Sequence, residues 1–234
     1  RGGAAGVRMS RGLRVAIDGP TGAGKGTVAR MVAQRLGYRY VDTGAMYRAV
    51  AWKVLREGVD PDDAEGVASL VRRTRVALEP WEEGLRVWCD GEDVTEAIRS
   101  VEVSAVVGRV AANPAVRRVL TEQQRQLASS GGVVMEGRDI GTVVLPDADV
   151  KVYLEASLEE RARRRYEEMR ARGERVLLED VRELVRQDDE MARSRATAPL
   201  RRAEDAVVVD TTGRSPEEVA EEIVRLVEAR AGVR

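Results

Sequence analysis

The sequence of 234 residues contains no histidine, no phenylalanine and one cysteine, Cys89. Without histidine, a Ser-His-Asp triad, a histidine general base and a histidine-ligated zinc site are all excluded. A lone cysteine can form neither an intrachain disulfide nor a cysteine metal site. Any chemistry must therefore rest on backbone amides, hydroxyls, carboxylates, arginines and three lysines, Lys25, Lys53 and Lys151.

Long apolar runs are also absent, since no stretch approaches the ~20 apolar residues that a membrane-spanning helix needs. The formal net charge is -1, so no global field draws the chain to nucleic acid or to a membrane surface. Three tryptophans without a basic aromatic stripe also argue against a nucleic-acid-binding module. We therefore expect a cytoplasmic monomer whose partners are small molecules, with no nucleic acid and no membrane among them.

What the sequence does contain is an alternation of short apolar strands and amphipathic helices. Strands are predicted at Leu13–Ile17, Tyr38–Val41, Val133–Glu136, Val150–Leu154 and Ala206–Asp210. Helices are predicted at Gly24–Leu36, Gly44–Glu57, Leu158–Arg172, Leu178–Arg193 and Pro216–Arg230. Strands separated by helices imply parallel crossovers, so we expect a three-layer α/β fold with a central parallel sheet.

The stretch between the second and third of these strands has a different pattern. Arg75–Glu79 and Leu85–Cys89 alternate in polarity around a Pro-Trp-Glu-Glu-Gly turn, which predicts a β-hairpin. Helices at Ser100–Val110 and Pro114–Ala128 are expected to lead back to the sheet. The predicted domains are a core of residues 9–42 and 129–234, an inserted subdomain of residues 43–128, and a disordered N-terminal extension of residues 1–8.

A glycine-rich segment joins the first predicted strand to the first predicted helix. It consists of Gly19, Pro20, Thr21, Gly22, Ala23, Gly24, Lys25, Gly26 and Thr27. Such glycines let consecutive N–H groups point at one polyphosphate, and the N-terminus of the next helix attracts the same anion. Lys25 can then reach the β- and γ-phosphates, and the Thr27 hydroxyl is placed for Mg²⁺. The flanking strand and helix favour this phosphate-binding loop over the alternative, a structural glycine turn.

A second group of anion-binding candidates starts the second predicted helix. Thr43, Tyr47 and Arg48 lie there, and a hydroxyl, a phenol and a guanidinium that converge can hold a phosphate monoester. An ordinary capped helix with a packed tyrosine explains the same segment equally well.

Three more charged residues have two interpretations each. Arg138 and Asp139 follow a predicted core strand, where charges are costly unless they bind a ligand or form a salt bridge with each other. Arg117, taken by itself, is typical of a solvated helix face.

Taken together, these segments resemble the bacterial cytidylate kinases of the nucleoside monophosphate kinase family. The resemblance runs from about Leu13 to the final predicted helix. It rests on I-D-G-P-x-G-A-G-K-G-T, D-T-G-A-M-Y-R, P-x-V-R, E-G-R-D-I-G-T-V-V and A-P-L. It implies the P-loop NTPase fold, in which the insert binds a monophosphate and a helical lid occupies about residues 157–176.

The resemblance also implies an activity, transfer of the ATP γ-phosphoryl group to CMP or dCMP with Mg²⁺. ATP would then lie on Gly19–Thr27, and cytosine would be recognised by Arg117 and Asp139. The CMP phosphate would lie near Thr43, Tyr47, Arg48 and Arg138.

The predicted helix that resembles the family's mobile lid opens with four arginines, Arg161, Arg163, Arg164 and Arg165. They cannot all face a ligand, because they point around the helix. We select Arg164 and Arg165 as catalytic residues, together with Lys25 and Arg138.

The sequence departs from the family pattern at two places. Gly108 stands where many relatives carry serine before the cytosine-reading arginine. Before A-P-L the family usually shows R-D-x-x-D-x-x-R, and the matching positions here are Asp188, Ala192 and Arg195. Only Arg195 is carried over, as a catalytic residue. Arg186, Arg193 or the Asp188–Asp189 pair could replace the missing arginine and aspartate, and the sequence does not choose among them.

A phosphate-binding loop is also compatible with two other functions. A kinase for UMP or AMP would share every phosphate contact, and only the residues at the base edge would differ. A nucleotide-dependent switch protein needs an Asp-x-x-Gly segment after a strand and guanine-reading residues, and neither is present in that context.

Overall fold

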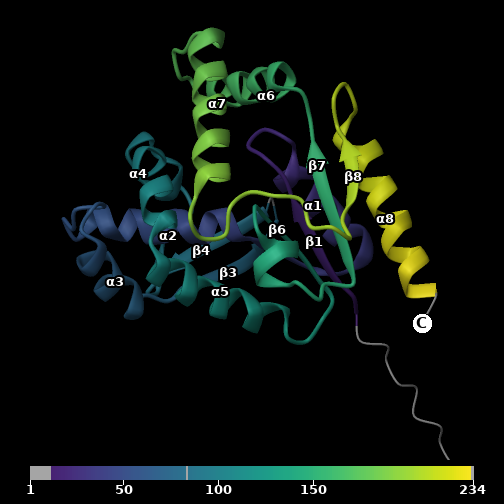
Figure 1. The fold of residues 1–234 in the computed structure, drawn as a ribbon, viewed down its shortest axis with the longest axis horizontal. Helices are drawn as coiled ribbons and strands as arrows, with labels where there is room; N and C mark the ends of the chain where they lie inside the picture. The colour runs from purple at the N-terminus through teal and green to yellow at the C-terminus, as the bar shows by residue number, and fades with distance from the viewer. Residues whose placement is uncertain (1–11, 83, 233–234) are drawn as a thin grey trace, which may run out of the picture.

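The computed structural model describes residues 12–82 and 84–232, and the predicted extension, residues 1–8, lies outside them. A five-stranded parallel sheet forms the centre, with strand order β2-β6-β1-β7-β8 (Figure 1). Its strands are β1 (Arg14–Asp18), β2 (Arg39–Asp42), β6 (Val133–Gly137), β7 (Val150–Glu155) and β8 (Val207–Asp210). All five predicted strands are confirmed, and no boundary differs from the predicted one by more than one residue.

The sheet is buried on both faces, and alternate residues of each strand supply the two faces. In β1, Val15 and Ile17 pack into one apolar cluster while Ala16 packs into the other. In β6, Val134 belongs to the first cluster and Met135 to the second. This period of two is the geometry of a pleated strand, so β1 and β6 contribute to both layers of the core.

Helices α1 (Lys25–Leu36) and α8 (Pro216–Gly232) cover the first face (Figure 1). Their apolar residues, Val28 and Val32 on α1 and Ile223 and Val227 on α8, recur at helical spacing and are fully or almost fully buried. The C-cap of α1 is Gly37, with φ 66°, which ends the helix just before β2.

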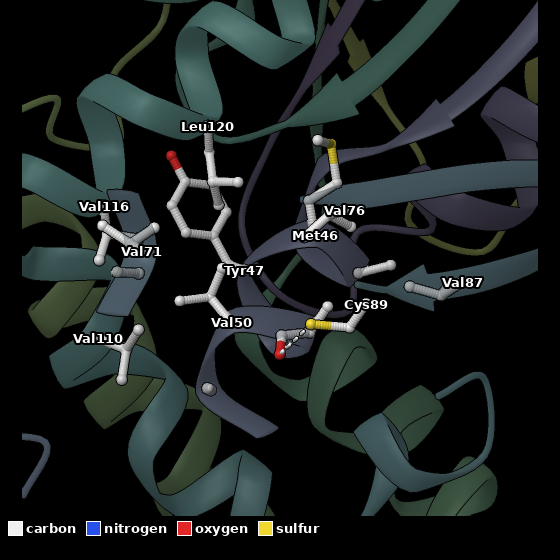
Figure 2. Close-up of a cluster of buried hydrophobic side chains, with 14 of the residues drawn as sticks. Met46, Tyr47, Val50, Val71, Val76, Val87, Cys89, Val110, Val116 and Leu120 are labelled. Atoms are coloured by element: carbon white, nitrogen blue, oxygen red, sulfur yellow. Dashed lines mark hydrogen bonds between the residues drawn. The ribbon is translucent and has the colours of Figure 1, made fainter. Parts of the chain in front are cut away.

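Residues 43–132, between β2 and β6, build the second half of the molecule. Its elements are α2 (Thr43–Arg56), α3 (Ala64–Arg72), β3 (Val76–Trp81), β4 (Gly84–Cys89), β5 (Glu92–Asp93), a 3₁₀ turn (Ala97–Arg99), α4 (Val101–Ala112) and α5 (Pro114–Ala128). The predicted hairpin is the antiparallel pair β3–β4, to which β5 adds a short third strand. Figure 2 shows the apolar core of this half of the molecule, where Met46, Tyr47 and Val50 of α2 meet Val116 and Leu120 of α5.

The sequence did not predict α3, the short strand β5, the 3₁₀ turn or a π-helical turn after β6. Helix α3 begins after Asp63, whose carboxylate accepts from the Gly66 amide, and this capping residue was an available signal. A π-helical turn, Ile140–Val144, follows β6. Its first two amides, of Ile140 and Gly141, donate to the Asp18 carboxylate at 2.8 and 2.7 Å, a long-range contact that no local pattern reveals.

Helices α6 (Leu158–Ala171) and α7 (Leu178–Ser194) project from the sheet, and α7 returns toward α4 (Figure 1). Ser157 caps α6 by accepting from the Glu160 amide. Within the described ranges, no helix combines the length and apolar character that a membrane crossing requires.

Candidate active site

A cleft of about 1610 Å³ opens at the carboxyl ends of the central strands. Asp42, which ends β2, and Glu136 and Gly137, which end β6, line it together with the glycine-rich loop after β1. Helices α4, α6 and α7 supply further walls. Ligands of open parallel sheets bind at this edge, so the cleft is the candidate active site.

The predicted phosphate-binding loop lies between β1 and α1. Thr21, Gly22, Gly24, Lys25, Gly26 and Thr27 line the cleft, whereas Gly19, Pro20 and Ala23 do not. Gly22 and Gly24 have φ values of 77° and 92°, in the left-handed region that favours glycine. A Cβ on Gly22 would also lie 2.8 Å from the Arg161 carbonyl oxygen. Both positions therefore require glycine, and the loop has the tight turn that phosphate binding needs.

Lys25 and Glu136 are two ionisable residues that line the cleft beside the phosphate-binding loop. The Lys25 Nζ donates to the Pro20 carbonyl oxygen at 2.9 Å, and burial lowers the pKa of Lys25. Glu136 accepts from the Tyr40 hydroxyl at 3.2 Å, and burial followed by the Asp42 carboxylate raises the pKa of Glu136. Because burial disfavours the charged form of both groups, a polyphosphate bound beside Lys25 would favour its protonated form.

Glu136 was not among the predicted site residues, although it ends the strand next to β1. The exposed Thr27 side chain lines the same cleft. Both offer oxygen, the donor that Mg²⁺ prefers, and Mg²⁺ commonly uses one or two protein oxygens with water and substrate phosphates. No group of three or more acidic or cysteine ligands suited to a metal occurs in the part of the chain that the structure describes. The residues present therefore fit Mg²⁺ bound mainly by nucleotide and water.

Arg138 lies at the carboxyl end of β6 and reaches the phosphate-binding loop. Its Nη2 donates to the Thr21 hydroxyl at 2.6 Å and to the Asp188 carboxylate at 2.7 Å. Asp188 also accepts from Thr21. Arg138 and Asp139 are therefore not paired with each other, which was one alternative from the sequence.

The far end of the cleft contains a buried ion pair. Arg117 Nη2 donates to Asp139 Oδ2 at 2.6 Å, and Arg117 Nη1 donates to the Ala111 carbonyl oxygen at 3.0 Å. The solvated position suggested for Arg117 alone is wrong, because Arg117 is only 4% exposed. Its guanidinium lies 5.1 Å from the centre of the Tyr47 ring, and burial raises the pKa of Tyr47 to about 12. Tyr47 is thus a neutral hydroxyl at physiological pH.

The other residues predicted to bind the monophosphate already make different hydrogen bonds within the protein. Thr43 donates to the Glu136 carbonyl oxygen at 2.7 Å, so a phosphate contact would require this bond to be exchanged. Arg48 lines the cleft and donates to the Ser104 hydroxyl of α4 at 3.0 Å. Burial, followed by the charge of Arg165 and then by Arg138, lowers the pKa of Arg48. Three cations crowded in this way favour an anion among them.

Arg195 is a predicted site residue with buried hydrogen-bond donors that lack a partner in the part of the chain that the structure describes. Its Nε and Nη2 atoms are buried and have no hydrogen-bond partner among residues 12–82 and 84–232. It lines the cleft, and burial followed by Arg117 and Arg138 lowers its pKa. Buried guanidinium groups are normally hydrogen-bonded, so these donors point to a ligand.

The lid arginines divide into two groups. Arg165 lines the cleft and pairs with Glu168. Arg164 lies outside the cleft and donates to the Gly22 carbonyl oxygen at 3.3 Å and to Thr211 of the β8–α8 loop. Arg161, which we did not select, is buried and donates to the Thr21 carbonyl oxygen at 3.1 Å. Arg161 and Arg164 therefore hold the phosphate-binding loop from outside.

The two departures from the motif pattern have structural counterparts. A Cβ on Gly108 would lie 2.5 Å from Met191 Sδ, so the α7 methionine occupies the space beside this glycine. Ala192 is buried in a small apolar cluster with Tyr153 and Leu200. Arg186 pairs with Glu183 and Glu190 on its own helix, whereas Asp188 enters the cleft.

Comparison with known proteins gives strong sequence matches. A family model described as "Cytidylate kinase" matches residues 15–229. A cytidylate kinase of Geobacillus kaustophilus (strain HTA426) is 51% identical over 224 residues, which cover 96% of this chain and 100% of that protein. A cytidylate kinase of Desulfitobacterium hafniense (strain Y51) is 51% identical over 218 residues, covering 93% of this chain and 94% of that protein.

Solved structures match at the level of the fold. A gluconokinase from Sinorhizobium meliloti 1021 has a TM-score of 0.50 at 14% sequence identity, covering 94% of this chain and 93% of that one. At this identity the likeness concerns the fold alone.

Proposed function

The chain belongs to the cytidylate kinase family, and from that premise we propose that it transfers the γ-phosphoryl group of ATP to CMP or dCMP, giving ADP and CDP or dCDP. The observation that carries the proposal is the single cleft. The lysine of the phosphate-binding loop and the buried Arg117–Asp139 pair line it together, and so do Arg48, Arg138, Arg165 and Arg195. One cleft can therefore hold two anionic nucleotides.

Recognition of cytosine follows from hydrogen-bond chemistry at the Arg117–Asp139 pair. Cytosine offers O2 and N3 as acceptors and its exocyclic amine as a donor. Arg117 can donate to the acceptors, while Asp139 accepts from the amine. Uracil reverses part of this pattern and would leave buried groups unpaired, which costs on the order of 1–3 kcal/mol for each lost pairing.

The transfer needs no covalent enzyme intermediate, because the acceptor phosphate is already an oxyanion at neutral pH. Lys25 holds the β- and γ-phosphates, and Arg138, Arg165 and Arg195 neutralise charge that develops on the transferred group. Mg²⁺, held by the nucleotide with Thr27 and Glu136, would supply further charge neutralisation. Alignment of the two phosphates then provides most of the rate enhancement.

An ADP-release assay tests this function across CMP, dCMP, UMP, AMP and GMP at fixed ATP and Mg²⁺. We expect turnover with CMP and dCMP at least ~100-fold above the others, from two lost pairings. Preferred turnover of UMP or AMP would assign a different monophosphate kinase. ATP binding without turnover of any monophosphate would favour the switch protein.

We also propose that the protein is a cytoplasmic monomer. One cysteine in 234 residues is the usage typical of a reducing compartment, where disulfides are rare. Light scattering coupled to gel filtration should give one chain mass, and a mass of two chains would reject the monomer.

A further inference from the structure

Helix α7 directs two adjacent carboxylates to two different arginines. Asp189 makes a bidentate pair with Arg161 at 3.0 and 2.7 Å, and the two side chains are 11% and 6% exposed. Asp188 pairs with Arg138 at 2.7 Å, and these side chains are 37% and 29% exposed. The first pair is closed off from solvent, whereas the second faces the cleft.

Asp188 lies among groups that the proposed reaction assigns to phosphate binding. Its carboxylate accepts from Arg138 Nη2 and from the Thr21 hydroxyl of the phosphate-binding loop. Burial acts to raise the pKa of Asp188, but Arg138, Thr21 and Lys25 outweigh it and lower the pKa, so the group is an anion at neutral pH. Lys25 and Arg138 are the cations to which the proposed reaction assigns phosphate groups.

We propose that Asp188 is a resident anion of the phosphoryl-transfer site, which an incoming phosphate must displace from Arg138. This inference rests on the proposed function for the identity of the natural ligand. The two hydrogens of Arg138 Nη2 are already donated to Asp188 and Thr21, so a phosphate that binds this nitrogen must replace one of them, and two anions at this position repel each other. Phosphate binding therefore breaks the Asp188–Arg138 pair.

The neighbouring pair determines what happens to α7 after this exchange. Asp189–Arg161 is buried and bidentate, and Arg161 also donates to the Ala156 and Thr21 carbonyl oxygens, so this connection persists. Asp188 is released one residue away. The exchange thus frees the cleft-facing side of α7 while its attachment to the phosphate-binding loop stays intact, and Asp188 lowers the affinity of the site for phosphate.

Titration calorimetry on the full chain can measure this competition, with Asp188→Asn as the test variant. The asparagine keeps the size of the side chain and removes its charge. We expect Asp188→Asn to bind CMP and inorganic tripolyphosphate about three- to fivefold more tightly, the upper part of the range for losing one partly exposed ion pair. Cytidine, which has no phosphate, should bind Asp188→Asn and the unchanged protein equally.

Two control variants separate charge from structure. Asp188→Glu retains the competing anion, and Glu190→Gln removes an exposed charge two residues away that pairs with Arg186 on the same helix. Both should bind tripolyphosphate within about twofold of the unchanged protein. If Asp188→Asn unfolds, Asp188→Ser replaces it, and thermal melting checks that each variant is folded.

Unchanged or weaker tripolyphosphate binding by the folded neutral variant would overturn the inference and leave Asp188 as a structural residue. Equal tightening of cytidine would also overturn it, because the effect would not depend on phosphate. A protein that binds tripolyphosphate but ignores CMP would reject the proposed function instead. The ratio of tripolyphosphate affinities would then still test Asp188.

Discussion

Arg117 donates to Asp139 across 2.6 Å at the end of the cleft, and each of these side chains is 5% exposed. A buried pair of this kind stabilises the fold mainly because each charge would be costly without the other. The same pair is proposed to recognise cytosine, so structure and specificity depend on the same two side chains.

Replacing Asp139 by alanine should therefore have two effects. It leaves the Arg117 charge buried and unpaired, which should lower the free energy of unfolding by roughly 3–5 kcal/mol. It should also weaken CMP far more than ATP, because only CMP is proposed to contact this pair. Urea denaturation and separate titrations with the two nucleotides measure these effects. An equal loss of affinity for both would show that Asp139 acts only through the fold.

Replacing Lys25 by alanine should reduce turnover by about two to three orders of magnitude, since a preorganised charge on the transferred phosphates is lost. The fold should persist, because within residues 12–82 and 84–232 the Lys25 side chain makes a single hydrogen bond, to the Pro20 carbonyl oxygen. Turnover assays and far-ultraviolet circular dichroism provide the measurements. Arg35→Ala, at an exposed position on the same helix, is the matched control. Near-normal turnover would remove Lys25 from the mechanism.

Replacing Arg161 by lysine should raise the KM for ATP about tenfold and change the KM for CMP much less. Lysine keeps the charge but cannot reproduce the bidentate pair with Asp189 and the bonds to the Thr21 and Ala156 carbonyl oxygens. Arg163→Lys is the matched control, since Arg163 is exposed and pairs with Glu160 and Glu167 of its own helix, α6. If both substitutions behave alike in steady-state kinetics, Arg161 does not position the loop.

Asp18 should make stability depend on pH in an unusual direction. Burial raises the pKa of Asp18 from 3.8 to about 6, despite two hydrogen bonds from backbone amides. Between these values the folded protein binds a proton that the unfolded chain has released, so the unfolding free energy falls as pH rises. The contribution across this window is about 3 kcal/mol.

Denaturant unfolding at pH 4, 5, 6 and 7 tests this, with Asp18→Asn as the variant. The asparagine cannot titrate, so between pH 4 and 6 its stability should fall by about 3 kcal/mol less than that of the unchanged protein. The fall that remains belongs to other buried carboxyl groups with a raised pKa, such as Glu136. Glu65→Gln changes an exposed carboxylate on α3 and should preserve the curve of the unchanged protein. Parallel curves for Asp18→Asn and the unchanged protein would reject the raised pKa.

The sequence was sufficient to predict the elements whose signals are local. Apolar runs located the five strands, and the glycine-rich segment after β1 located the phosphate-binding loop. Helix α3 was missed although Asp63 was a capping signal, because Gly66 interrupts its first turn. The π-helical turn after β6 depends on Asp18, more than 100 positions away, so no local pattern could reveal it.

The partners of individual side chains were much harder to predict. Arg161, Arg163, Arg164 and Arg165 all lie on one helix, but the direction of each depends on how α6 rotates against the phosphate-binding loop. That rotation placed Arg164 on Gly22 and Thr211 and left Arg165 in the cleft. The pairing of Asp188 with Arg138 likewise depends on the return of α7 across the sheet edge, which helical periodicity does not encode.

The strand order β2-β6-β1 also has a consequence for folding during translation. β1 and β2 are consecutive in the chain but do not touch as strands, since β6 lies between them and Val133 pairs with both Arg14 and Arg39. During translation, neither early strand acquires its shared neighbour until the ribosome has made the whole intervening half. Sheet assembly with such distant pairings is slow, because a long loop must close before any pairing is gained. Nascent chains of this protein should therefore carry two unpaired strands until β6, residues 133–137, has been made.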